Sequence, residues 1–444
     1  MPDSKPAVAP SLLTGTNSGR TFRGLLTKRT STARGVPVGL ETLQLLPISG
    51  RQVVIRVEAS APCYTMVPEV LPTAPPLAPA APFAPATGLA FPITPPADLP
   101  EHALCISNHA YVGLVEEVGP QVTRVRPGDR VVVGVTAQCG HCFQCLRGAT
   151  DMCQTTFGGG DEVTTPIASL QDGSLVFPSI GIGGLSELSV AFEDYCVPVF
   201  TDVPAVELSL LADQLASGLA VGMSRMQIDA ASDVVIFGAG PVGLGAVQSA
   251  RIRGAAQIIV VEPVGRRREL ALKLGATAVV DPVAEGDGLV DSLRAMCKPP
   301  TSRRTSGGHT HRGTALGADY SISTVGAELY PPAVEAGPDP TGVLPMQQAY
   351  ATARSGGNVM WMGMVSGSAS FPASQLGLSS RTVWPGQQAG IASMRDIPRF
   401  VTLIEKGLVD ARSMIDGVYS LDQAVPAVRA IADRTAAATV VTPT

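Results

Sequence analysis

Two patterns of hydrophobic and polar residues divide the chain at about residue 208. In the first part, short apolar segments are separated by glycine, proline and polar residues. Within 53–59, β-branched residues at alternate positions are set against Arg56 and Glu58. Such alternation is typical of strands that bury one face. We therefore predict a β-rich first domain with further strands at 22–26, 40–46, 109–119 and 131–135.

After about residue 208, strand-like and helix-like segments alternate, which predicts a parallel, doubly wound sheet. A first helix is expected to reach Met226, and the last strand of this sheet is expected at 358–362. The other predicted strands are 234–237, 258–262, 278–280 and 319–324, and the other helices are 242–253 and 266–274. Beyond about Gly386, a helix at 397–405 and a strand at 439–441 are predicted to return to the first domain.

A glycine-rich turn follows the apolar strand at 234–237. Gly238, Gly240 and Gly243 have G-x-G-x-x-G spacing between this strand and a helix. The first permits a tight turn, the second lets the backbone approach a pyrophosphate, and the third lets the helix pack close to the strand. The amides at the start of the helix would face the phosphates. The alternative is a glycine turn in another kind of α/β sheet. The predicted dinucleotide-binding residues are Gly238, Gly240, Pro241, Val242, Gly243, Glu262 and Arg267.

Glu262 ends the next predicted strand, 19 positions after Gly243. An acid about 20 residues beyond the glycines binds a ribose 2′-hydroxyl, and it repels the 2′-phosphate of NADP. NAD is therefore the expected cofactor. Arg266, Arg267 and Arg268 leave NADP possible, although the first turn of a solvated helix also explains them.

Four of the eight cysteines form a C-x2-C-x2-C-x7-C pattern. In a long intracellular chain, such crowding favours a metal over disulfides. Four thiolates suit a closed, structural zinc site. An iron–sulfur cluster is the alternative, but its cysteine runs have a shorter final gap and a following proline. His141 lies in this loop and is expected to be a bystander. The predicted ligands are Cys139, Cys142, Cys145 and Cys153.

Composition limits the classes of function. A net charge of -5 offers no basic surface for nucleic acid or an anionic membrane. No apolar run approaches the 18 residues of a transmembrane helix, and residues 1–19 lack the apolar core of a secretory signal. From these features we expect a cytoplasmic protein. The 444 residues predict two domains.

Two segments interrupt the domains. Residues 67–100 contain eleven prolines and no charge between Glu69 and Asp98. We favour packing of this insert on a surface over a polyproline-like linker, because it is poorly solvated. The polar segment 299–312 is predicted to be a solvated loop, in preference to a phosphate clamp.

These motifs together resemble the zinc-containing medium-chain dehydrogenase/reductase family, the alcohol dehydrogenases. The resemblance rests on Val57-Glu58-Ala59 leading to Cys63, the His109 segment, 127–131, the cysteine lobe and the glycine turn. It implies an α/β fold: a GroES-like β-rich catalytic domain over 1–212, with the zinc lobe at 136–156, and a Rossmann domain over 213–386. Residues 387–444 would return to the catalytic domain.

The resemblance also implies a catalytic zinc. Cys63 and His109 stand at two of the family's ligand positions, and Asp213, five residues before Gly218, stands at the third. Thr65 matches the hydroxyl of the proton relay. The expected reaction is interconversion of a small-molecule alcohol and an aldehyde or ketone with NAD, in a homodimer or homotetramer.

Three departures from the family pattern keep other functions open. Ala110 and Asn108 stand where the family has the Glu and Gly of Gly-His-Glu, and Met66 stands where it has an Asp. One alternative is a reductase of an activated C=C or C=N bond whose catalytic zinc is lost or altered. The other is a dinucleotide-binding relative without enzymatic activity.

Overall fold

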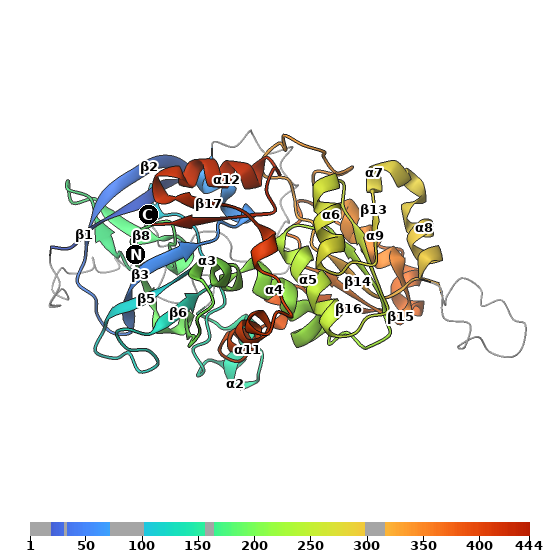
Figure 1. Cartoon of the computed structure of the whole chain (residues 1–444), viewed down its shortest axis with the longest axis horizontal. Coiled ribbons are helices and arrows are strands. Elements are labelled where there is room, and N and C mark those ends of the chain that lie inside the picture. The colour runs from blue at the N-terminus through green and yellow to red at the C-terminus, as the bar shows by residue number, and fades with distance from the viewer. Residues whose placement is uncertain (1–18, 31–32, 72–101, 156–163, 298–315) are drawn as a thin grey trace, which may run out of the picture.

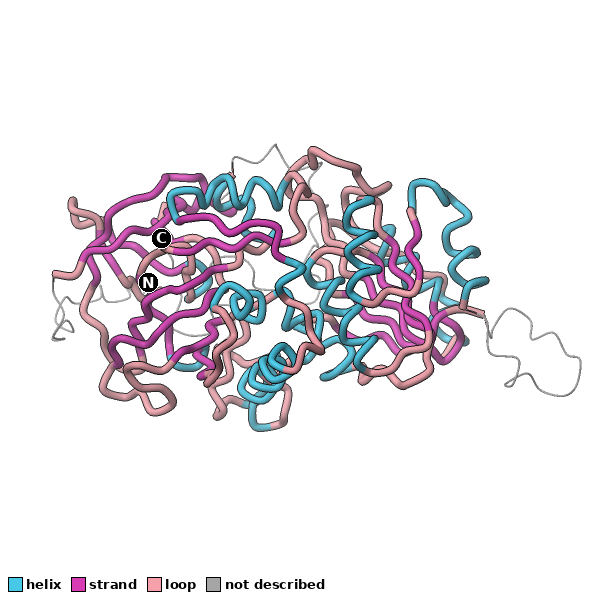
Figure 2. Tube along the Cα trace, viewed as in Figure 1, coloured by secondary structure: helices cyan, strands magenta, loops and turns pink. Residues whose placement is uncertain are grey.

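The computed structural model describes residues 19–30, 33–71, 102–155, 164–297 and 316–444. A β-rich half and a half built on one parallel sheet lie side by side, with helices between and around them (Figures 1 and 2). The predictions for the segment 299–312 and for all but the first residues of the insert 67–100 lie outside the described residues. The described start of that insert forms the helix α1 (Val67–Val70).

The β-rich half contains a closed barrel and a seven-stranded sheet. Most of their strands are short, because glycine, proline and polar residues interrupt the apolar segments, but β1, β2 and β3 have 10, 13 and 9 residues. The barrel strands are β1 (Thr21–Thr30), β2 (Ala33–Leu45), β7 (Ala168–Ser169), β8 (Leu175–Pro178) and β4 (Leu104–Ile106). The sheet runs β10 (Cys196–Pro198), β6 (Arg130–Val133), β5 (Tyr111–Val118), β3 (Gln52–Ser60), β18 (Ala438–Thr442) and β17 (Ile415–Ser420), and β9 (Leu188–Phe192) pairs with β3.

The other half has a six-stranded parallel sheet in the order β13-β12-β11-β14-β15-β16. This is the doubly wound order of a Rossmann fold, as predicted. The strand predicted to be last, at 358–362, is followed by a further one, β16. The strands are β11 (Asp233–Phe237), β12 (Gln257–Val261), β13 (Ala278–Val280), β14 (Ala318–Ser323), β15 (Ala353–Trp361) and β16 (Thr382–Pro385).

Helices cover both faces of this parallel sheet (Figure 1). On the central strand β11, Val234 and Ile236 pack on one side, and Val235 and Phe237 pack on the other. A strand buried on both faces is a continuous apolar run, which is why it is conspicuous in the sequence. The helices are α5 (Pro241–Ile252), α6 (Gly265–Leu274), α7 (Pro282–Glu285), α8 (Leu289–Met296), α9 (Val343–Thr352) and α10 (Ala373–Leu378).

The prediction of one helix that reaches Met226 is wrong. It is divided into α3 (Ala205–Leu208), the 3₁₀ turn η6 (Ser209–Ala212), α4 (Gln214–Ala220) and the π-turn η7 (Val221–Arg225). The break lies at Asp213, where φ is −154° and ψ is −84°. Among the described residues no single helix could cross a membrane; only the bent pair 205–212 and 214–225, at 61°, passes by length and composition.

The C-terminal segment joins the β-rich half. β18 pairs with β3 and β17, and α12 (Ala424–Ala432) packs beside them. The amphipathic helix predicted at 397–405 is α11 (Ser393–Glu405). The domain boundaries at 212/213 and 386/387 stay predictions.

Candidate metal centres and cofactor site

The three predicted ligands of a catalytic metal lie together. Cys63 follows β3, His109 precedes β5, and Asp213 occupies the break before α4. One ligand atom from each lies within 4.8 Å of the others. His109 Nδ1 is 3.9 Å from Asp213 Oδ2. A sulfur, an imidazole nitrogen and a carboxylate therefore converge between the two halves of the molecule.

Asn108 joins the two loops that carry Cys63 and His109. Its backbone is left-handed, with φ of 71°, a conformation that asparagine tolerates better than most residues. The buried side-chain amide donates to Ser60 Oγ and Ala61 O, and Asn108 Oδ1 accepts from the Cys63 amide at 3.4 Å. This departure from the family's Gly-His-Glu thus acquires a role of its own, which the sequence analysis missed.

Thr65 and Gln214 lie at the edge of the cluster. Thr65 Oγ1 lies 3.2 Å from Cys63 Sγ and 3.3 Å from His109 Nε2. Gln214 Nε2 donates to Pro62 O at 3.1 Å, which fixes the start of α4 against the Cys63 loop. The hydroxyl predicted to relay protons therefore borders two of the three predicted ligands.

The three-ligand cluster fits a metal ion. His109 Nδ1 is buried and has no hydrogen-bond partner among the described residues. Burial, and then the charge of Asp213, raise the pKa of the Cys63 thiol. A bound cation would reverse this effect, because a coordinating thiol is deprotonated. Cys, His and Asp are zinc ligands, and three of them leave a fourth position open.

The four cysteines of the lobe also lie within 4.8 Å of one another. The Sγ atoms of Cys139 and Cys145 are 3.9 Å apart, and those of Cys142 and Cys153 are 4.0 Å apart. A tetrahedron with Zn–S bonds of about 2.3 Å has edges of roughly 3.8 Å. The spacing fits one tetrahedral ion.

Backbone amides point at two of the lobe sulfurs. The amide of Cys142 points at Cys139 Sγ, and that of Cys145 points at Cys142 Sγ. Burial opposes ionisation of Cys142, but hydrogen bonds from the amides of Gln154 and Cys145, together with those from the thiols of Cys139 and Cys145, outweigh it and lower its pKa to about 6. His141 Nδ1 lies 3.2 Å from Cys139 O and contributes no atom to the cluster.

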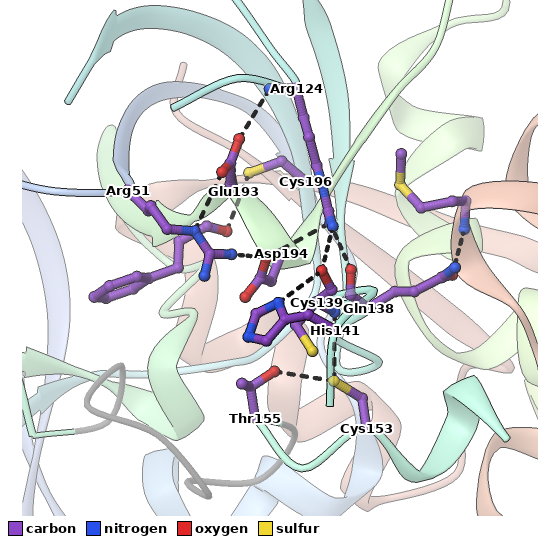
Figure 3. A network of polar contacts seen from close by, with 12 residues as sticks. Arg51, Arg124, Gln138, Cys139, His141, Cys153, Thr155, Glu193, Asp194 and Cys196 are labelled. Atoms are coloured by element: carbon purple, nitrogen blue, oxygen red, sulfur yellow. Dashed lines mark hydrogen bonds and ion pairs between the residues drawn. The ribbon is translucent and has the colours of Figure 1, made fainter. Parts of the chain in front are cut away.

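An ion-pair network around the buried Asp194 borders the cysteine lobe (Figure 3). Asp194 is fully buried and pairs with Arg51 and Arg124. Arg124 also donates to the carbonyls of Gln138 and Cys139, at the start of the lobe. These bonds therefore attach Cys139, the first predicted ligand of the lobe, to the β-rich half.

The glycine turn has the shape of a phosphate site. Gly238 is left-handed, with φ of 94°, and a Cβ on Gly243 would collide with the carbonyl of Gly238. A Cβ on Gly240 would meet nothing within 4 Å. Open space therefore lies at the N-terminus of α5, whose first residues are Pro241 and Val242. The N-terminus of a helix stabilises a bound pyrophosphate.

Glu262 closes the same turn. Its buried carboxylate accepts from the Ala239 amide at 2.7 Å and from the Val264 amide at 2.9 Å. The arginines that follow bind other parts of the chain. Arg266 pairs with Asp416, Arg267 donates to Ala436 O, and Arg268 donates to Glu262 O. A direct role for Arg267 at the cofactor stays a prediction.

Comparisons with known proteins show the family of the chain. The model described as "Alcohol dehydrogenase GroES-like domain" matches residues 49–201, and "Zinc-binding dehydrogenase" matches 241–406. Geraniol dehydrogenase of Castellaniella defragrans is 32% identical over 68% of this chain and 74% of its own. Alcohol dehydrogenase class-3 of Cereibacter sphaeroides is 26% identical over 72% and 79%.

Solved structures share the fold. Benzyl alcohol dehydrogenase of Acinetobacter calcoaceticus superposes with a TM-score of 0.71 at 21% identity, covering 95% of this chain and 99% of its own. An alcohol dehydrogenase zinc-binding domain protein of Burkholderia ambifaria gives 0.73 at 23%, with the same coverage. The chain belongs to the zinc-containing medium-chain dehydrogenase/reductase family and is an alcohol oxidoreductase of that family.

Proposed function

We propose that the protein is a zinc-dependent, NAD-linked dehydrogenase that interconverts a small-molecule alcohol and an aldehyde or ketone. The observation that carries the proposal is the convergence of Cys63, His109 and Asp213 within 4.8 Å. Taken singly, Cys63 and His109 could be core residues, and Asp213 could be an acid on the face of a helix. Brought together from three separate loops, with a buried imidazole nitrogen that no described residue hydrogen-bonds, they have the chemistry of an open zinc site.

The reaction needs a polarised oxygen and a hydride acceptor, which bound zinc and NAD would supply. The chain's own contribution is position and proton transfer. Cys63, His109 and Asp213 would hold the ion, and Thr65 Oγ1 borders them, 3.2 Å from Cys63 Sγ. In the oxidation, this hydroxyl would accept the proton of the substrate alcohol and pass it outward.

NAD is proposed over NADP because of Glu262. The fixed carboxylate would meet the ribose 2′-hydroxyl and repel a 2′-phosphate. Arg266 and Arg268 are engaged with Asp416 and Asp281, which removes them from such a phosphate. The lobe cysteines are proposed to hold a second, structural zinc. A cytoplasmic homodimer or homotetramer is our prediction from the sequence and from the family.

The first experiment is zinc content per chain, on protein purified without added metal, for the unmodified chain and for Cys63→Ser. We expect two zincs to fall to one, with loss of alcohol oxidation and retention of the fold. Cys297→Ser is the control, because this buried cysteine lies outside both clusters and should leave two zincs. Turnover of alcohols and aldehydes is then compared with NAD and with NADP.

One zinc per chain, unchanged by Cys63→Ser, would contradict the proposal. The reductase of an activated double bond would then be favoured, because Ala110 and Met66 stand where the family has a Glu and an Asp.

A further inference from the structure

An unusual turn approaches the metal cluster from the C-terminal part of the chain. In η10 (Gln387–Gly390), three successive residues are left-handed: φ is 42° at Gln388, 49° at Ala389 and 74° at Gly390. Only the last is a glycine. Left-handed conformations of other residues cost about 1–3 kcal/mol each and persist where the surroundings impose them, often at functional sites.

Two neighbours hold this turn in place. Arg225 lies against Gly390, where any Cβ would collide with its guanidinium, and Arg225 is itself paired with Asp151. Thr150 Oγ1 donates to Ile391 O at 3.4 Å, directly after the turn. Both Thr150 and Asp151 belong to the 3₁₀ turn η2 (Thr150–Met152) beside the cysteine lobe, so the lobe supports η10.

The turn places the Gln388 side chain against Asp213. Gln388 Nε2 donates to Asp213 Oδ1 at 3.4 Å, and Gln388 Oε1 accepts from Ser217 Oγ. Ser217 Oγ also lies 2.8 Å from the Asp213 carbonyl. The two carboxylate oxygens of Asp213 thus have different neighbours: Gln388 at Oδ1, and His109 Nδ1 at 3.9 Å from Oδ2.

We infer that Gln388 is a positioning residue for the third metal ligand, holding Oδ1 so that Oδ2 of Asp213 faces the metal site. The inference rests on the proposed function. Hydrogen bonds to ligating carboxylates orient them and typically change metal affinity 10–100-fold. Ala110, the residue after His109, has no carboxylate with which to orient the cluster, which leaves this role to contacts such as those of Gln388 and Asn108.

The test is Gln388→Met, which removes the amide but keeps the volume. Volume matters because Gln388 and Asp213 line the same small cavity. Metal affinity at the three-ligand site is measured by competition with a chelator. The absorption spectrum of the Co²⁺-substituted protein is recorded as the second readout. We expect 10–100-fold weaker binding at this site, a changed cobalt spectrum, and an unchanged metal content in the cysteine lobe.

Two further variants separate positioning from simple support of the fold. Ser217→Ala removes the hydroxyl that binds Gln388 and should shift the cobalt spectrum in the same direction. Ser393→Ala is the matched control, because Ser393 lines the same cavity but donates to Thr136 O. It should leave both readouts unchanged.

Wild-type affinity and spectrum in Gln388→Met would overturn the inference while leaving the zinc mechanism intact. Equal loss of metal from both sites, together with a fall in melting temperature, would also overturn it, because Gln388 would then only support the fold. If the unmodified chain binds metal at the lobe alone, the proposed function fails and the inference fails with it.

Discussion

Gly240 and Gly243 stand in one turn, yet a side chain would meet different surroundings at each. At Gly240 the backbone has ordinary φ of −71°, and an added Cβ projects into open space. At Gly243 the same atom collides with the carbonyl of Gly238. Gly240 therefore leaves space that a ligand could occupy, whereas Gly243 is needed for the close approach of α5 to the carbonyl of Gly238.

We predict that alanine weakens cofactor binding at position 240 and lowers the stability of the protein at position 243. Gly240→Ala should raise the KM for NAD about 10-fold, equivalent to ~1.4 kcal/mol, and leave the melting temperature nearly unchanged. Gly243→Ala should cost about 1–3 kcal/mol of stability or more, because the turn is overpacked. Steady-state kinetics and thermal unfolding measure both. An unchanged KM in Gly240→Ala would place the pyrophosphate elsewhere.

At the scale of one element, α11 carries one fully buried acid, Asp396, beside its apolar face. Asp396 has no exposed side-chain surface, accepts from the Ala392 amide and Ser224 Oγ, and pairs with Arg395 and Arg399. Burial opposes its ionisation, but the bonds from Arg395, Ala392 and Ser224 outweigh it and lower the pKa of Asp396. The charge thus ties α11 to η7.

We expect Asp396→Asn to reduce the free energy of unfolding by about 1.5–3 kcal/mol at pH 7, as for hydrogen bonds to a charged group. Since the folded pKa is depressed, the stability is present above the unfolded pKa of about 3.9 and is lost as the pH falls toward the folded pKa. The difference between the two proteins should therefore shrink below about pH 4. Urea unfolding across pH measures it, with exposed Asp287→Asn as the control.

At the scale of the whole molecule, what the sequence could predict depends on how far apart the determining residues are. β11, α5 and β12 follow from apolar runs and glycines within a few positions. β16 and β17 were missed, because Pro385 ends the first and Gly417 interrupts the second, and their neighbours in the sheets supply the hydrogen bonds.

The candidate site also has a part that the sequence could predict and a part that it could not. The ligand residues themselves could be assigned from the family's motifs, because each is a type with metal chemistry. The contacts that orient them could not. Gln388 lies 175 positions from Asp213, and nothing in a Gln-Gln-Ala-Gly segment indicates two left-handed residues before the glycine. The break at Asp213 was hidden too, since apolar residues continue on both sides.

One hydrophobic cluster crosses both halves of the molecule. It joins Ala59 and Val112 of the β-rich half to Leu219 of α4 and to Ile236 of the parallel sheet. A core shared in this way couples the two halves, because neither can expose its surface without disturbing the other. We therefore expect one cooperative unfolding transition for the metal-loaded protein, in contrast to the separate transitions of independent domains.

Leu219→Ala tests this coupling, because Leu219 is fully buried in the shared cluster. The truncation should cost about 2–5 kcal/mol and move the single transition to lower temperature without splitting it. Leu272→Ala, at a site that is 45% exposed, is the matched control and should shift it little. Differential scanning calorimetry shows the outcome directly. Two transitions, of which the variant moves only one, would mean that the halves unfold independently and that the shared cluster is an interface between separate cores.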